Sequence, residues 1–242
     1  MHIKYLLVLT LAAIATLTTP EIRADALPSA CPSSASLSAY LSMAGGCMIG
    51  DKIFSNFSYS ITSTQGGATA IVADGITVNP ITTSNDPGLQ FSANWSASSG
   101  QVSDSLIGFT VTVADQSALI EDASVTQLGG SVIGTGTANV GEGICLGFNC
   151  QSINFTLNTI NTTDATLIKL GDHESFSPVG QVRATDSIGV SGNANGSAGV
   201  SLFAMQFSEI QQASVPEPAM LTLLSLGLLG CSGAFGRRRR FS

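Results

Sequence analysis

The stretch Ile107-Gly108-Phe109-Thr110-Val111-Thr112-Val113 places apolar side chains at every second position. Successive side chains of a β-strand point to opposite faces, so the apolar set is expected to line one face of a sheet. β-Branched and aromatic residues also suit a pleated, half-buried surface. The stretch therefore predicts a strand with one buried face.

The same alternation recurs on both sides of this stretch. Further alternating sets are Ile53, Phe57, Tyr59 and Ile61; Ile153, Phe155 and Leu157; and Phe203, Met205 and Phe207. Turn sequences separate them, namely Gln65-Gly66-Gly67, Asn85-Asp86-Pro87-Gly88, Ser98-Ser99-Gly100, Leu128-Gly129-Gly130 and Gly192 to Gly199. Short strands with such turns predict a mainly β fold, an antiparallel β-sandwich of jelly-roll-like or Ig-like type.

Composition and charge agree with one β-rich body, expected over residues 27–214. Only 10% of the 242 residues are charged and glycine occurs 26 times, which favours strands and turns over helices. Between Leu27 and Ser214, three basic residues oppose thirteen carboxylates, a formal charge of −10. Nucleic-acid binding needs clustered Lys and Arg, so no nucleic-acid partner is expected.

Residues 1–26 have the pattern of a secretory signal peptide, with its signal helix. Lys4 supplies positive charge, Leu6 to Leu17 form a short apolar stretch, and the small residues Ala24 and Ala26 suit a signal peptidase. Cleavage is expected before Leu27. An uncleaved anchor is the alternative, but about 12 apolar residues are too few for a bilayer core that needs about 20.

Residues 215–242 form a tail of three parts. The first part is Val215, Pro216, Glu217 and Pro218, whose prolines favour an extended and accessible backbone. An apolar run over residues 219–235 follows; as a transmembrane helix it would be about 26 Å long, close to a bilayer core. The basic end, residues 236–242, contains Arg237, Arg238, Arg239 and Arg240. The positive-inside rule places these arginines in the cytoplasm and the body outside.

This tail resembles the PEP-CTERM sorting signal in its Pro216-Glu217-Pro218 tripeptide, its helix and its closing arginines. The resemblance implies a protein exported across the inner membrane of a Gram-negative bacterium. It also implies transient anchoring and cleavage by an exosortase-like membrane peptidase, followed by residence at the cell surface or in the extracellular matrix. An ordinary tail anchor is the alternative. The features from Cys31 to Tyr59 resemble a recurring set of uncharacterised proteins of this family, which brings no known activity.

Four cysteines remain in the body, and an even number in an oxidising compartment predicts disulfides. Three pairings are possible. The spacing favours Cys31 with Cys47 and Cys145 with Cys150, because each pair closes a short loop. The first loop is expected to hold one or two helical turns, and the second to be a hairpin tip. Zinc is the alternative, but the spacings and histidines that it requires are missing, so no metal site is predicted.

The body contains few residues that could take part in catalysis. His173 is its sole histidine and is expected to be a solvated loop residue, because no Gly-x-Ser-x-Gly nucleophile motif accompanies it. The neighbouring carboxylates Glu121 and Asp122 are expected to point apart, and no calcium-binding loop motif occurs. Trp95 is expected to fill the core, with stacking on a sugar ring as the alternative. We therefore predict no catalytic residue, no cofactor and no enzyme.

The function predicted first is an exported cell-surface or exopolysaccharide-associated matrix protein. Its expected partners are signal peptidase, the exosortase-like peptidase, the membrane before processing, and exopolysaccharide. A secreted glycan-binding β-sandwich is the alternative, with Trp95 as its platform. A carboxylate-based hydrolase that uses Glu121, Asp122, Asp172 and Glu174 is the weakest hypothesis.

Overall fold

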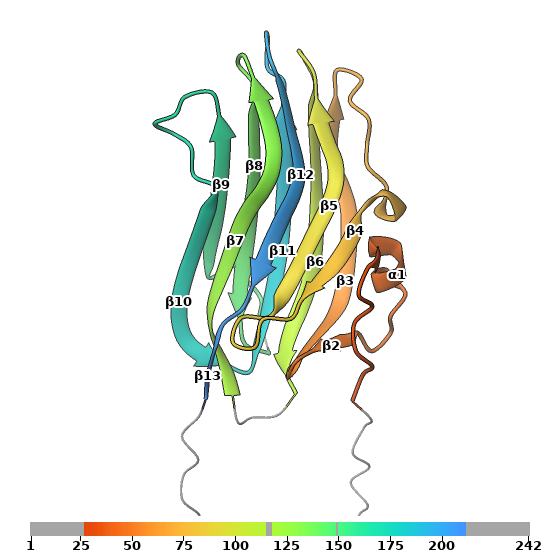
Figure 1. Ribbon diagram of the computed structural model, residues 1–242, viewed down its shortest axis with the longest axis vertical. Coiled ribbons are helices and arrows are strands. Elements are labelled where there is room, and N and C mark those ends of the chain that lie inside the picture. The colour runs from red at the N-terminus through yellow and green to blue at the C-terminus, as the bar shows by residue number, and fades with distance from the viewer. Residues whose placement is uncertain (1–26, 115–117, 149, 212–242) are drawn as a thin grey trace, which may run out of the picture.

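Two antiparallel β-sheets pack face to face in the computed structural model, which describes residues 27–114, 118–148 and 150–211 (Figure 1). Sheet I has the order β1-β4-β5-β12-β7-β10, and β13 also pairs with β7. Its strands are β1 (Ala35–Ser36), β4 (Thr77–Ile81), β5 (Gly88–Ala97), β7 (Ala118–Ile133), β10 (Gly171–Val179), β12 (Ser197–Gln206) and β13 (Glu209–Gln211).

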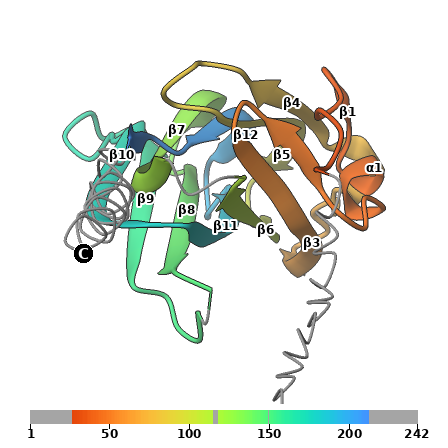
Figure 2. The ribbon, with the colours of Figure 1, turned by 90° about the horizontal axis from the view of Figure 1, so that it is seen from below.

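Sheet II has the order β2-β3-β6-β11-β8-β9. Its strands are β2 (Cys47–Ile49), β3 (Lys52–Gln65), β6 (Val102–Val113), β8 (Thr137–Leu146), β9 (Phe155–Thr162) and β11 (Gln181–Ser191). Figure 2 shows the two sheets as layers when the sandwich is viewed from its end. The mainly β sandwich predicted from the sequence is confirmed.

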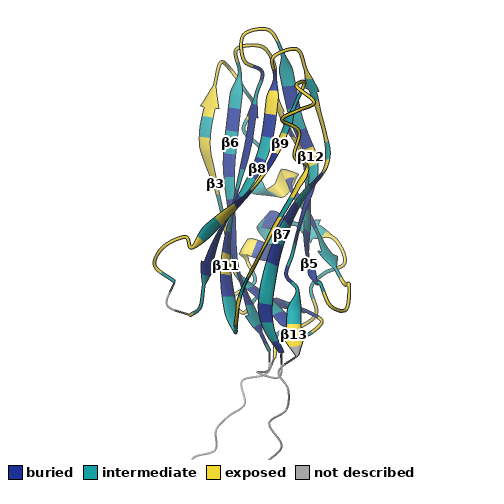
Figure 3. Ribbon diagram, turned by 90° about the vertical axis from the view of Figure 1, so that its left-hand side faces the viewer, coloured by how far each residue is buried: buried dark blue, intermediate teal, exposed yellow. Residues whose placement is uncertain are grey.

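The alternating residues of β6 form the centre of the core. Ile107, Phe109 and Val111 are buried, as their shared parity predicts. Phe109 contacts Phe91 of sheet I, with ring centroids 6.1 Å apart, and Phe91 stacks on Phe203 at 5.1 Å. Buried positions recur in this way along the strands of both sheets (Figure 3). Burial of these large side chains stabilises the sandwich by about 1.5 to 3 kcal/mol each.

The open edge between β3 and β4 is covered by the helix α1 (Leu37–Leu41) and the 3₁₀ turn η1 (Ala73–Gly75), beside which α1 lies in Figure 1. The Ser36 hydroxyl caps the helix by accepting from the amide of Ala39 at 3.4 Å. Tyr40 is buried and its ring lies edge-on to Phe57. The disulfide between Cys31 and Cys47, with Cα atoms 4.7 Å apart, closes the loop that holds this helix.

One strand departs from the predicted parity. Asn56 has a φ of 53°, and the pairing of β3 with β6 shifts between Ser55 and Ser58. This bulge places one extra residue in β3, so that Phe54 and Phe57 both face the core. The prediction that Ile53 shares the buried face with Phe57 is wrong for this reason.

Two predicted boundaries also differ from the structure. Leu128-Gly129-Gly130 continues β7 instead of forming a turn, and it lies opposite the bulge of β12 between Val200 and Leu202. Ile153 precedes β9 and is 57% exposed, so it does not belong to the buried set of that strand. In both cases the contacts with neighbouring strands, which local sequence does not contain, decide the conformation.

Candidate functional site

A trough on the outer face of sheet II is the main candidate binding site of the described chain. It consists of two adjoining hollows with volumes of ≈ 120 Å³ and ≈ 470 Å³. Both hollows are lined by Gly143, Thr185 and Ile153, so they form one continuous depression over β8, β11 and the loop before β9. The larger hollow is within the ordinary size range of ligand pockets, about 300 to 1,000 Å³.

The alternation of β8 explains why the face is hollow here. Val140, Glu142 and Ile144 are buried on the core side, and Gly141 and Gly143 lie between them on the outer side. Glycine has no side chain, so two successive outward positions leave the sheet backbone uncovered. A Cβ atom at Gly143 would lie 2.7 Å from Cδ1 of Ile153, which shows how closely the loop before β9 overhangs this strand.

The lining of the larger hollow is mostly apolar, and hydroxyl and amide groups lie among the apolar surface. Thr185 and Ser187 come from β11, Thr156 and Asn158 from β9, and Leu106 from β6. These groups donate and accept hydrogen bonds without carrying charge.

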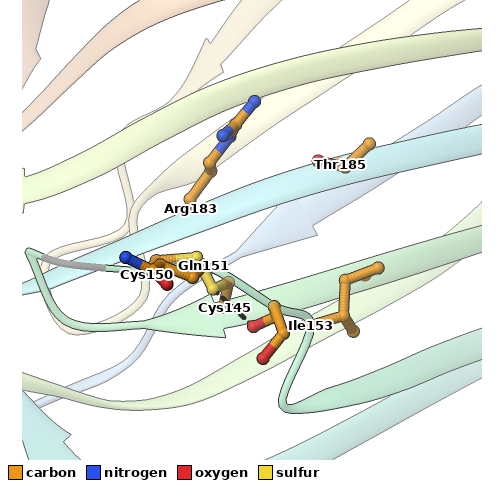
Figure 4. A pocket seen from close by; sticks show the side chains of 8 residues that line it. Cys145, Cys150, Gln151, Ile153, Arg183 and Thr185 are labelled. Atoms are coloured by element: carbon orange, nitrogen blue, oxygen red, sulfur yellow. Dashed lines mark hydrogen bonds between the residues drawn. A yellow bond between two sulfur atoms is a disulfide. The ribbon is translucent and has the colours of Figure 1, made fainter.

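A disulfide fixes the loop at one end of the trough. It joins Cys145 of β8 to Cys150, with Cα atoms 5.6 Å apart. Gln151 and Ile153 follow on the same loop, and Arg183 and Thr185 lie on the neighbouring strand β11 (Figure 4). This loop therefore borders the hollow in which the arginine side chain lies.

Arg183 is the basic residue of this face. It is exposed, and no carboxylate of the described residues lies within 4.0 Å of it. Asp104 is the acidic residue of the face and leans, with Asn139, over Gly189 of β11. Partial burial raises the pKa of Asp104. The two charges are six residues apart along the strand direction, about 20 Å, so the arginine is free to bind an anion.

Two carboxyl groups lie beneath the trough, on the core side of the same strands. Glu142 and Asp186 are directly opposite each other in the pairing of β8 with β11, and both are fully buried. None of their carboxyl oxygens has a hydrogen-bond partner within the described chain. Burial raises the pKa of both groups, and the proximity of Asp186 raises that of Glu142 further. Neither group reaches the outer surface.

The residues considered for catalysis lie on the paired strands β7 and β10, but within the described chain no ion pair joins the His173 ring to a carboxylate. His173 lies on β10, an edge strand, and is exposed; the prediction of a loop is wrong because this segment pairs with β7 over Gly171 to Ser175. Glu121 and Asp122 are consecutive residues of β7, and Asp122 lies opposite Ser175, whose hydroxyl donates to it at 3.4 Å. Within the described ranges, no group of three or more His, Cys, Asp or Glu residues is placed to hold a metal ion.

Trp95 lies in the core. Its side chain is 1% exposed, and its Nε1 donates a hydrogen bond to the Ser105 hydroxyl at 3.0 Å across the two sheets. A glycan platform built on this ring is therefore contradicted.

The sequence feature that indicates the trough is the Gly141-Glu142-Gly143 stretch, which places two glycines on the outer face of a strand. It is not among the candidate sites predicted from the sequence.

The predicted terminal sites lie outside the described residues. These are the signal-cleavage residues Ala24 and Ala26, the segment Val215 to Pro218, the apolar run 219–235 and the arginines 237–240. Within the part of the chain that the structure covers, no helix is long and apolar enough to cross a membrane. The described chain begins and ends at the same end of the sandwich (Figure 1).

The tail of the chain matches a known family of sorting motifs. Its sequence matches a family model over residues 214–240, described as the PEP-CTERM protein-sorting motif. The chain carries a PEP-CTERM sorting motif. The resemblance seen in the sequence is thereby confirmed. A PEP-CTERM motif implies export and processing at the membrane by an exosortase-type enzyme.

The folded body that precedes this motif resembles solved structures only distantly. No curated protein matches the chain in sequence. A tailspike protein 4 enzymatically active domain of bacteriophage CBA120 is 16% identical, with a TM-score of 0.27 over 64% of this chain and 20% of that one. The chain thus spans about a fifth of that tailspike domain.

Two further solved structures are similarly distant. TmCBM61, solved in complex with β-1,4-galactotriose, is 11% identical, with a TM-score of 0.29 over 72% of this chain and 98% of that one. The glycosylation-associated Gap123 complex of Streptococcus agalactiae is 9% identical, with a TM-score of 0.27 over 68% and 27%. Scores this low transfer no ligand or activity to this chain.

Proposed function

We propose that this chain is an exported cell-surface or extracellular-matrix protein of a Gram-negative bacterium, and that it is the substrate of an exosortase-like peptidase. The observation that carries this proposal is the PEP-CTERM motif at residues 214–240. The motif begins three residues after Gln211, the last residue of β13. The folded body therefore precedes a tail built for membrane insertion and cleavage.

The proposed processing has two cuts. Signal peptidase cleaves after Ala26 during export. The apolar run 219–235 then holds the chain in the membrane, and Arg237 to Arg240 keep its end in the cytoplasm. The exosortase-like enzyme hydrolyses a peptide bond near Pro216 to Pro218, and water takes the acyl group; prolines favour an extended and accessible backbone in such a segment.

A jelly-roll class is proposed for the body. Strands β5, β12, β7 and β10 are neighbours in sheet I, and β6, β11, β8 and β9 are neighbours in sheet II. Apart from the hairpin of β8 and β9, successive strands from β5 to β12 thus cross between the sheets as in two Greek keys, which is the jelly-roll arrangement. The order does not follow the ABED and CFG sheets of an Ig domain.

The body is also proposed to have no catalytic activity. His173 is exposed on the edge strand β10, and Glu142 and Asp186 are enclosed in the core. General acid–base chemistry needs such groups within hydrogen-bond reach of a substrate. This separation supports a structural or binding role.

Terminal masses of the protein from fractionated native cells test the proposal. We expect a body that starts at Leu27 and ends between Val215 and Pro218 in the surface or matrix fraction. Glu217→Ala should leave Arg237 to Arg240 attached and hold the protein in the inner membrane. Glu174→Ala, which removes an exposed carboxylate on β10, is the matched control and should be processed normally. An intact tail on the native protein would contradict the proposal.

Glycan binding is the second candidate function. The trough over β6, β11, β8 and β9 favours it, because hydroxyl and amide groups beside apolar surface are what sugar rings contact. Trp95 takes no part in it, since its side chain is enclosed in the core.

A further inference from the structure

We propose that the trough on sheet II binds an acidic polysaccharide, with Arg183 as the residue that selects a carboxylate on the sugar. This inference deepens the second candidate function and names its ligand class. The three observations that carry it are the glycine-lined hollow, its mostly apolar lining with uncharged hydroxyl and amide groups, and the unpaired cation.

The positive charge of Arg183 favours a negatively charged ligand. Of the three basic residues in the body, Lys52 is buried against Asp51 and Glu209, and Lys169 pairs with Asp172 at 2.7 Å. Arg183 alone among the described residues is without such a partner. A guanidinium group binds a carboxylate through two parallel hydrogen bonds, which gives selectivity as well as affinity.

An anion can bind at Arg183 although the body as a whole is acidic, because the nearest negative charge on this face is far away. Asp104, which is half-buried, is the one acid on strands β6, β11, β8 and β9 that is not enclosed in the core, and it lies about 20 Å from Arg183 along the strands. This exceeds the Debye length of about 8 to 10 Å at physiological salt. Repulsion between Asp104 and a carboxylate bound at Arg183 is therefore largely screened.

The rest of the trough favours a sugar over a peptide. Strands β6, β11 and β8 are hydrogen-bonded on both sides. On the edge strand β9, the amide of Asn158 donates to Asp172 and that of Ile160 to the Lys169 carbonyl, so these amides are not free for strand addition. Thr185, Ser187 and Asn158 can exchange hydrogen bonds with sugar hydroxyls. Leu106 and Ile153 offer apolar surface to the C–H face of a ring.

Calorimetry on the protein purified from native cells tests the inference, in whichever processed form the terminal masses establish. The probes are a galacturonic acid hexamer, its methyl ester, and a glutamate hexamer. We expect the free acid to bind at least about tenfold more tightly than the ester, because only the acid can form the charged pair. Equal binding of acid and ester, or binding of neither, overturns the inference; equal binding of the glutamate hexamer points to an acidic peptide and overturns it too.

Matched variants locate the site. Arg183→Gln should weaken binding of the acid about tenfold and leave the ester unaffected. Gly143→Val, which puts a side chain into the hollow, should weaken both sugars. Lys169→Gln removes a positive charge that is already paired with Asp172 beside β9, and it should change neither. An unchanged affinity of Arg183→Gln, with the Trp95 emission spectrum of the native fold, would overturn the assignment. These measurements do not depend on whether the tail is cleaved, so they fail separately from the sorting proposal.

Discussion

At the residue scale, the least expected feature is a pair of acids inside the sandwich. Glu142 and Asp186 share the core side of β8 and β11 with Val140, Ile144 and Ile188. Two ionised carboxylates without partners would be very costly in such surroundings, so burial favours the protonated form of both groups and raises the pKa of each. Protonation removes the charge, so the burial of each group costs less free energy.

This arrangement predicts a pH-dependent free energy of unfolding. In the unfolded chain both acids ionise near pH 4, whereas the folded chain holds their protons to a higher pH, since burial raises both pKa values. The folded state binds more protons, so this contribution is complete below about pH 4 and is lost as the pH rises through the raised pKa.

Urea unfolding of the native protein and of the Glu142→Gln/Asp186→Asn double variant, measured at a series of pH values, checks this. The stability of the native protein should fall relative to that of the variant as the pH rises. The amides cannot ionise, so the variant lacks this slope. Parallel pH profiles would show that the two acids are not held protonated.

At the element scale, β13 is held to the sandwich by a buried ion pair. Lys52 Nζ contacts Glu209 Oε2 and lies 3.3 Å from Asp51 Oδ1. The Lys52 side chain is fully buried, and that of Glu209 is 10% exposed. The pair joins the start of β3 to the last described strand, 157 residues away in sequence. It therefore fastens the sandwich at the point where the sorting tail begins.

Breaking this pair should destabilise the fold. Lys52→Met leaves Glu209 charged and nearly buried, so we expect a loss of about 3 to 5 kcal/mol in the free energy of unfolding by urea. The double variant Lys52→Met/Glu209→Leu should recover most of this loss. Lys169→Met breaks the more exposed pair with Asp172 and is the control, with an expected loss below about 1 kcal/mol. An equal loss of stability in Lys52→Met and Lys169→Met would contradict the stabilising role of the buried pair.

At the scale of the whole molecule, the two sheets share one core. A single cluster of buried residues runs from Leu37 near the N-terminal disulfide to Phe207 near β13. Phe109 contacts rings from both sheets, including Phe91 of sheet I and Phe57 of sheet II. Neither sheet can expose its inner face without uncovering the other.

The shared core predicts a single cooperative unfolding transition of the disulfide-bonded body. Trp95 is the only tryptophan, and it reports on contact between the sheets through its hydrogen bond to Ser105. Its fluorescence and the far-UV circular dichroism should therefore change at the same urea concentration. A separate, earlier fluorescence transition would mean that the sheets come apart before their strands unfold.

The sequence by itself determined the features that depend on local order along the chain. Alternation at Ile107 to Val113 predicts a strand because side chains of a strand alternate between faces. The short spacings of Cys31 and Cys47, and of Cys145 and Cys150, favoured the pairings seen in the structure. The segment from Pro216 to Arg240 reveals the sorting motif, because its parts act in linear order.

Only the tertiary structure decided which strands are neighbours. The bulge at Asn56 moves Phe54 into the core, and no local pattern shows that β6 requires it. Glu142 and Asp186 are 44 residues apart, and only the pairing of β8 with β11 makes them a buried pair. The same pairing sets Arg183 beside the Gly143 hollow. Contacts between distant segments create these sites, and such contacts form only when the sheets assemble.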